Sequence, residues 1–298
     1  MRNDVIKGET VATFAEDLQA MAGRAYELAL EFCGPCANYH IYWTARRAAG
    51  IVGGVDADRH LLVKQLANLA KRFTPPGDRG IDLLIPGVAD SGILAAAVAA
   101  IFEVGGRSLL QRTEFTVIDQ CATPLKLCEE YSRKHDLKVS TERCKLENYR
   151  PDRSFDLVFA HSVLAFFQPE DRARMLSAMA NWLKKDGHFV YSANLGVSEN
   201  TGKAARFENI VLPRIGDAVA DGRIKLCEEE TAFLERCRQR HQGISYESTG
   251  FRTLDELHAL AESANVEIES VKLADDDDIA NGIPRRSRVI AVFKRSIN

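Results

Sequence analysis

Residues 81–92 read Ile81-Asp-Leu-Leu-Ile-Pro-Gly87-Val-Ala89-Asp-Ser-Gly92, and this segment carries the strongest indication of the fold. A short apolar run, typical of a buried strand, leads into a turn, and the Ala- and Leu-rich segment that follows is predicted to be a helix. Small residues at 87 and 89 let the backbone turn sharply near a ligand, and Gly92 lets the helix pack closely on the strand. This Gly-x-Ala-x-x-Gly spacing is a form of the glycine fingerprint, although an ordinary strand–helix turn can show it too.

The pattern beyond this segment alternates between short apolar strands and helices. Strands are predicted at 81–86, 114–119, 137–140, 155–160 and 187–192, with helices at 92–104, 123–135 and 169–183 between them. This alternation predicts a doubly wound α/β fold with a mostly parallel sheet and right-handed crossovers. A helix at 253–264 precedes two more strands, 266–273 and 287–294, which we expect to be an antiparallel pair at a sheet edge.

The composition and net charge do not indicate a particular class of partner. The 298 residues carry a net charge of −3, which gives no electrostatic drive toward nucleic acid or an anionic membrane. We expect no nucleic acid partner and no membrane: there is no apolar leader, and the apolar stretch Ile93–Phe102 is too short to span a bilayer. Basic clusters such as Arg46-Arg47 are expected to be solvated surface. Seven irregularly spaced cysteines are typical of reduced thiols, so a cytoplasmic location is expected.

Asp119 adds a second feature to the glycine turn. It stands at the carboxyl end of the strand 114–119, where a carboxylate can accept both hydroxyls of a ribose. The alternative is that Asp119 only caps the next helix. Two features in the right structural order favour a nucleoside-bearing cofactor more strongly than either feature alone.

The order of segments resembles the class I S-adenosylmethionine-dependent methyltransferases, a Rossmann-like family, in their small-molecule form. The features that carry the resemblance are the glycine turn, the acid after strand two, Phe155-Asp-Leu-Val at strand four, Leu183-Lys-Lys-Asp-Gly-His-Phe-Val into strand five, and a terminal antiparallel strand. The resemblance covers about residues 80–195 and 253–294. It implies seven strands in the order 3-2-1-4-5-7-6 with strand seven antiparallel, and S-adenosyl-L-methionine as cofactor.

The resemblance also implies a set of cofactor-binding residues. These follow the first four strands: Gly87, Ala89, Asp90, Gly92, Asp119, Gln120, Cys144, Lys145, His161 and Ser162. Three departures from the family pattern stand out. Ile85 occupies a position that is usually acidic, and Ala89 replaces the middle glycine. Asp90, beside Ala89, is the candidate to replace the missing acid toward the amino group of methionine. Cys144 or Lys145 stands where the family has an Asp after strand three, so adenine recognition would depend on backbone groups and apolar contacts.

Three residues are candidates for catalysis. His161 follows strand four and could deprotonate an acceptor or bind the cofactor. Tyr39, in the aromatic stretch Tyr39–Trp43, could hold the cationic sulfonium, and Asn194 after strand five could orient the acceptor. For each the alternative is a structural role, such as core packing of the aromatic ring or a satisfied buried histidine.

The family resemblance and the helical patterns together suggest a division of the chain. Residues 1–78 are expected to form an N-terminal helical cap, and residues 79–298 a Rossmann-like catalytic domain with a helical insertion at 196–250. The extra helices could roof a pocket for a small acceptor. A homodimer is left open.

Cys33-Gly-Pro-Cys36 has the spacing of a thioredoxin redox motif, but it follows a predicted helix rather than a strand. A zinc site with His40 is disfavoured because only two cysteines lie nearby, and we therefore expect no metal. Cys121 and Cys128 lie seven residues apart on one predicted helix and are expected to be buried. Asp275–Asp278 is expected to be a solvated loop rather than a cation site.

The preferred function is in-line methyl transfer from S-adenosylmethionine to a small molecule. One alternative uses the same cofactor for aminocarboxypropyl transfer or cyclisation, which releases methylthioadenosine. Others are an NAD(P)-dependent oxidoreductase and a non-catalytic binding protein on the same scaffold. The fourth strand is not followed by Asn-Pro-Pro-Tyr, so methylation of amino groups on nucleic acid bases is disfavoured.

Overall fold

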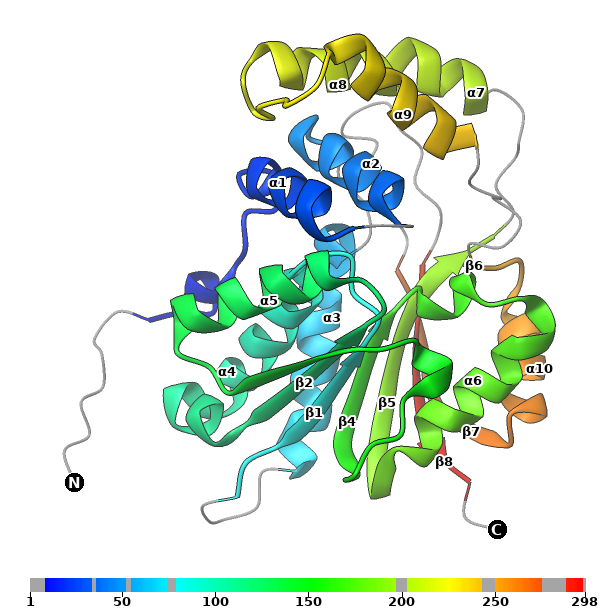
Figure 1. The fold of residues 1–298 in the computed structure, drawn as a ribbon. Helices are drawn as coiled ribbons and strands as arrows, with labels where there is room; N and C mark the ends of the chain where they lie inside the picture. The colour runs from blue at the N-terminus through cyan, green and yellow to red at the C-terminus, as the bar shows by residue number, and fades with distance from the viewer. Residues whose placement is uncertain are drawn as a thin grey trace.

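The computed structural model describes residues 9–33, 36–51, 55–73, 79–196, 203–242, 250–274 and 288–296. A twisted central sheet has helices on both faces, and further helices lie over one end of it (Figure 1). The acidic loop 275–278 lies outside the described residues.

The sheet has the predicted order. Its strands are β1 Asp82–Pro86, β2 Glu114–Asp119, β3 Val139–Arg143, β4 Phe155–His161, β5 Leu183–Leu195, β6 Gly250–Phe251, β7 Val266–Ala274 and β8 Arg288–Arg295. They run β3-β2-β1-β4-β5-β8-β7, and β6 pairs with β5 off this path. Among the described pairs, only β5–β8 and β7–β8 are antiparallel, so β8 runs opposite to the other strands. The order 3-2-1-4-5-7-6 is confirmed once the short β6, which was not predicted, is left out of the numbering.

Helices cover both faces of the central strands, as a parallel sheet requires. The helices beside the sheet are α3 Val55–Ala70, α4 Gly92–Arg112, α5 Ala122–His135, α6 Pro169–Asn181 and α10 Leu254–Ser263. The interiors of β1 and β4 are buried throughout, because helices shield them from water on both sides. One core cluster unites α3, α4, β1 and β2, and another unites α6, α10, β4, β5 and β8.

Helix α4 is longer than predicted. It breaks at Gly105 and Gly106, where Gly106 has a φ of +60°, and it then resumes to Arg112. Among the described helices it is the one long and apolar enough to cross a membrane by length and composition, contrary to the sequence estimate of a shorter apolar stretch. Because 61% of that stretch is buried inside the fold, α4 fits the role of a core helix against the sheet.

A second helical layer lies over the carboxyl ends of the strands (Figure 1). We call it the roof, and it consists of α1 Ala22–Phe32, α2 Ala37–Ala48, α8 Leu212–Ala220 and α9 Glu230–Gln242, with the short α7 Lys203–Arg206 and a π-helical turn at Phe207–Val211 leading into α8. Helices α1 and α2 share one apolar cluster with α8 and α9, which come from a distant part of the chain. His241 joins them directly, since it hydrogen-bonds Tyr42 at 2.9 Å and stacks on Phe207.

The expected division at residue 78 remains a proposal. By packing, α3 belongs with the sheet, since Leu62 and Leu66 are buried in the same cluster as Ile93 of α4. The roof is instead built from α1 and α2 together with the predicted insertion.

Candidate active site

The glycine turn after β1 has the tight geometry that the sequence predicts. Gly87 has a φ of +75°, and its N–H donates to the Ile118 carbonyl at 2.8 Å. A Cβ at this position would lie 2.5 Å from Val163 Cγ2. Both the left-handed backbone and the close approach of Val163 therefore require glycine here.

Asp119 meets this turn directly. Its Oδ2 accepts the Val88 N–H at 3.0 Å, and its Oδ1 accepts the Cys121 N–H at 2.7 Å. Burial raises the pKa of Asp119, and the two backbone hydrogen bonds partly offset that effect. The carboxylate therefore faces the glycine turn across the ends of two neighbouring parallel strands, and each oxygen keeps a lone pair for a further donor.

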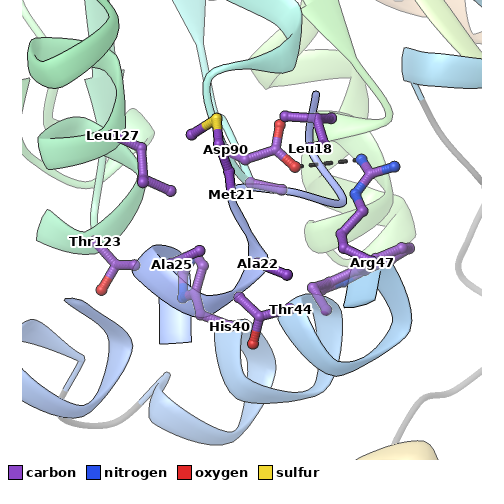
Figure 2. A pocket seen from close by; sticks show the side chains of 12 residues that line it. Leu18, Met21, Ala22, Ala25, His40, Thr44, Arg47, Asp90, Thr123 and Leu127 are labelled. Carbon is purple, nitrogen blue, oxygen red and sulfur yellow. Dashed lines mark hydrogen bonds and ion pairs between the residues drawn. The ribbon is translucent and has the colours of Figure 1, made fainter. Parts of the chain in front are cut away.

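Asp90 connects the turn to the roof. Its Oδ1 accepts the Gly92 N–H at 2.8 Å, and its Oδ2 pairs with Arg47 Nη2 at 3.2 Å (Figure 2). The Arg47 side chain is only 10% exposed, so the expectation that Arg46-Arg47 is solvated surface is wrong for Arg47. The sequence gives no indication of this contact, because the role of Arg47 depends on how α2 docks over the strand ends.

A small cavity adjoins the Asp90–Arg47 pair. It lies between the segment around Leu18 and Met21, helices α1 and α2, and the start of α5 (Figure 2). Its volume is about 20 Å³, enough for a water-sized group. A nucleoside ligand bound here would have to displace side chains of the roof.

His161 is the last residue of β4 and lies beside Ser192 of β5. Burial lowers the pKa of His161 well below 6.5, and the positive charges of Arg288 and Arg47 lower it further. Its Nδ1 is buried without a hydrogen-bond partner among the described residues. His161 is therefore neutral at physiological pH, with a ring nitrogen available to a ligand.

Two further predicted residues flank His161 at the same strand ends. Ser162 has a left-handed φ of 54°, and its N–H donates to the Ser192 carbonyl at 2.7 Å. Asn194, near the end of β5, lies opposite Gly250 of β6 and Arg288 of β8.

Tyr39 extends from the roof toward these strand ends. Its ring contacts Phe166 edge-on at 5.7 Å, and the Arg240 guanidinium lies 5.2 Å from its centroid. Burial raises the pKa of Tyr39, and the charges of Asp119 and Asp90 raise it further. The hydroxyl therefore stays protonated.

The remaining predicted residues lie around the ends of β2 and β3. The backbone N–H of Cys144 donates to the Asp119 carbonyl at 3.0 Å. The backbone carbonyl of the exposed Gln120 accepts a hydrogen bond from Arg143 Nε at 3.3 Å. Lys145 precedes the turn Leu146–Asn148. The structure thus brings the predicted residues to one edge of the sheet, while their roles toward a cofactor remain predictions.

Part of the chain is similar in sequence to known proteins. Residues 104–187 match the family model described as a methyltransferase domain. A chemotaxis protein methyltransferase of Vibrio parahaemolyticus is 32% identical over 84 residues, which cover 25% of this chain and 29% of that protein. The matched region therefore spans less than a third of the length of this relative.

Solved structures resemble the chain over a longer range but at low identity. Magnesium protoporphyrin IX methyltransferase from Synechocystis with bound SAH is 10% identical, with 80% of this chain and 84% of that chain covered and a TM-score of 0.48. N-methyltransferase NodS from Bradyrhizobium japonicum is 12% identical, with 79% and 86% covered and a TM-score of 0.42.

The matched segment runs from the end of α4 to the start of β5 and contains Asp119 and His161, but not the glycine turn. The match and the sheet order together confirm the predicted resemblance to the class I methyltransferases.

Proposed function

We propose that this protein is an S-adenosyl-L-methionine-dependent methyltransferase that acts on a small-molecule acceptor. The observation that carries the proposal is the contact between Asp119 and the turn after β1, at the Val88 N–H. In an open α/β sheet, ligands bind at the carboxyl ends of the strands, where these two groups meet.

The side chains around this contact suit the parts of the cofactor. Asp119 would accept the ribose hydroxyls, and the small residues Gly87 and Ala89 would leave room for the backbone to approach the ligand. Arg47 would pair with the carboxylate of the methionine arm, and Asp90 with its ammonium group. When bound, the cofactor supplies an electrophilic methyl group on a sulfonium, so the protein has chiefly to position and desolvate the acceptor.

The acceptor would lie under the roof. Tyr39 would donate a hydrogen bond or present its ring to the sulfonium, and neutral His161 would accept a proton or a hydrogen bond from the acceptor. Asn194 would orient the acceptor from the end of β5. Helices α1, α2, α8 and α9 over the strand ends favour a small enclosed substrate rather than a polymer. We further propose a cytoplasmic enzyme without nucleic acid or membrane partners, and a homodimer is one assembly to test.

Calorimetric titration of the full chain is the first test. S-adenosylmethionine and S-adenosylhomocysteine should both bind, and NAD(H) should not. Product analysis then separates the uses of the cofactor, since methyl transfer leaves S-adenosylhomocysteine and aminocarboxypropyl chemistry leaves methylthioadenosine. Binding of NAD(H) alone, or release of methylthioadenosine alone, would overturn the proposal.

A further inference from the structure

Four soft-metal ligands meet where the roof contacts the sheet. Cys33 follows α1 as its C-cap, Cys36 is the N-cap of α2, His40 lies in the first part of α2, and Cys121 precedes α5. Their ligand atoms all lie within 4.8 Å of one another. Along the sequence, only two cysteines lie near His40. The fold adds Cys121, which is 88 residues from Cys33 along the chain.

The ligand atoms lie somewhat closer together than in an occupied zinc site. Cys121 Sγ lies 2.7 Å from Cys33 Sγ and 2.9 Å from Cys36 Sγ, and His40 Nδ1 lies 3.2 Å from Cys33 Sγ. In a tetrahedral zinc site with Zn–S bonds of about 2.3 Å, two sulfurs lie roughly 3.8 Å apart. An outward shift of about 1 Å would therefore accommodate the ion. The sulfurs are also farther apart than the roughly 2.05 Å of a disulfide.

The surroundings of the cluster favour metal binding. Cys33, His40 and Cys121 are 6%, 4% and 2% exposed, so this group of polar atoms is largely removed from water. The Thr123 hydroxyl lies 2.5 Å from Cys33 Sγ, close enough to hydrogen-bond a sulfur ligand.

We propose that one Zn²⁺ binds here through four protein ligands, Cys33, Cys36, His40 and Cys121. Thiolate and imidazole ligands suit zinc, and four protein ligands close the coordination shell, as in structural sites. The ion would tie the loop between α1 and α2 to the start of α5 and so fasten the roof to the sheet.

The proposed zinc site is connected to the candidate cofactor site through Cys121. The backbone N–H of Cys121 donates to Asp119 Oδ1, so a metal held by Cys121 would help to fix the carboxylate that faces the glycine turn. The zinc site does not depend on the proposed methyltransferase activity, because its evidence is the ligand cluster alone.

Metal analysis of the full chain, purified under reducing conditions with Zn²⁺ in the growth medium, tests this proposal. We expect one zinc per chain, and Co²⁺ in place of zinc should give thiolate-to-cobalt charge-transfer bands and the intense d–d bands of a tetrahedral site. Chelation should lower the thermal unfolding temperature, because binding to the folded state is lost.

Cys121→Ser and His40→Asn should each lose most of the zinc, whereas Cys227→Ser, at an exposed cysteine outside the cluster, should retain it. The cobalt spectrum of the unmodified chain still decides the question if a variant fails to fold. Absence of zinc together with absence of thiolate–cobalt bands in the reduced chain would overturn the proposal. So would full zinc content in a folded Cys121→Ser variant, or a Cys33–Cys121 disulfide that persists under the reducing conditions while the chain takes up neither ion.

Discussion

The Asp119 carboxylate accepts the backbone N–H of Val88 at 3.0 Å, which places the acid at the end of β2 against the turn that follows β1. Its other oxygen takes the Cys121 N–H. Two backbone donors from different strand ends therefore hold the carboxylate in one orientation. A preorganised acceptor of this kind loses little freedom when it receives the hydroxyls of a ribose.

Replacement of this acid tests its proposed role. Asp119→Asn should weaken S-adenosylmethionine binding about 10- to 100-fold, because a hydrogen bond to a charged group contributes roughly 1.5–3 kcal/mol. Calorimetry gives the affinity, and thermal unfolding shows whether the variant stays folded. Asp136→Asn is the matched control, since Asp136 is exposed at the end of α5 and asparagine tolerates its left-handed backbone. Equal affinities for a folded Asp119→Asn variant and the unmodified chain would refute the role.

The glycine turn should be sensitive to a single methyl group. Gly87→Ala adds both left-handed strain and a clash with Val163, so unfolding should become easier by about 1–3 kcal/mol. Gly222→Ala separates the two effects, since Gly222 has a similar φ of +72° but nothing lies within 4 Å of its added Cβ. We expect that control to cost about 1 kcal/mol. Denaturant unfolding measures both, and equal costs would show that the Val163 contact is unimportant.

Replacement of Arg47 should lower the affinity only for ligands that carry the amino acid arm of methionine. Arg47→Gln should lower the affinity for S-adenosylmethionine about tenfold, since a partly buried charge pair with the carboxylate is lost. The affinity for methylthioadenosine, which lacks that carboxylate, should change little. Competition binding with both ligands provides the measurement. A parallel loss for both ligands would show that Arg47 acts only by holding Asp90 and the turn.

His161 should make stability depend on pH. Its folded pKa lies well below the unfolded value of about 6.5, so the folded state holds the neutral ring and unfolding takes up a proton in mildly acidic solution. The contribution is fully present above about pH 6.5 and is lost as the pH falls through the window below it. His161→Gln should therefore lose less stability than the unmodified chain between pH 7 and pH 5, as measured by denaturant unfolding.

The matched control for His161 is His258→Gln, which removes an exposed histidine on α10. It should keep the pH dependence of the unmodified chain. His135 also has a lowered pKa through burial, so some acid sensitivity should remain in His161→Gln. An unchanged pH profile in His161→Gln would show that this ring is not held neutral by the fold.

Much of the sheet could be predicted because its central strands are short apolar runs with clear ends. The segment 114–119 matches β2, and 155–160 matches β4 within one residue. The edge strand β3 lies later than expected, at Val139–Arg143, because its polar residues give little hydrophobic pattern. The two-residue β6 is too short to leave a periodic signal, although Gly250 fits its close approach to Asn194.

The contact between Asp119 and the turn could be anticipated because both features end neighbouring parallel strands. The contacts of Arg47 with Asp90 and of Cys121 with Cys33 could not be anticipated. These partners lie 43 and 88 residues apart along the chain and meet only when the roof docks on the sheet. Cys121 and Cys128 are both buried as expected, but Cys121 precedes α5 rather than lying within it. Spacing within one helix gives no information about a ligand cluster assembled from three chain segments.

A crystal structure of the full chain with S-adenosylhomocysteine tests the proposed function most directly. We predict that the ribose hydroxyls lie within hydrogen-bond distance of the Asp119 carboxylate and that the amino acid arm lies beside Gly87 and Arg47. An adenosine group bound elsewhere, or an Asp119 carboxylate turned away from the ribose, would contradict the assignment of this site.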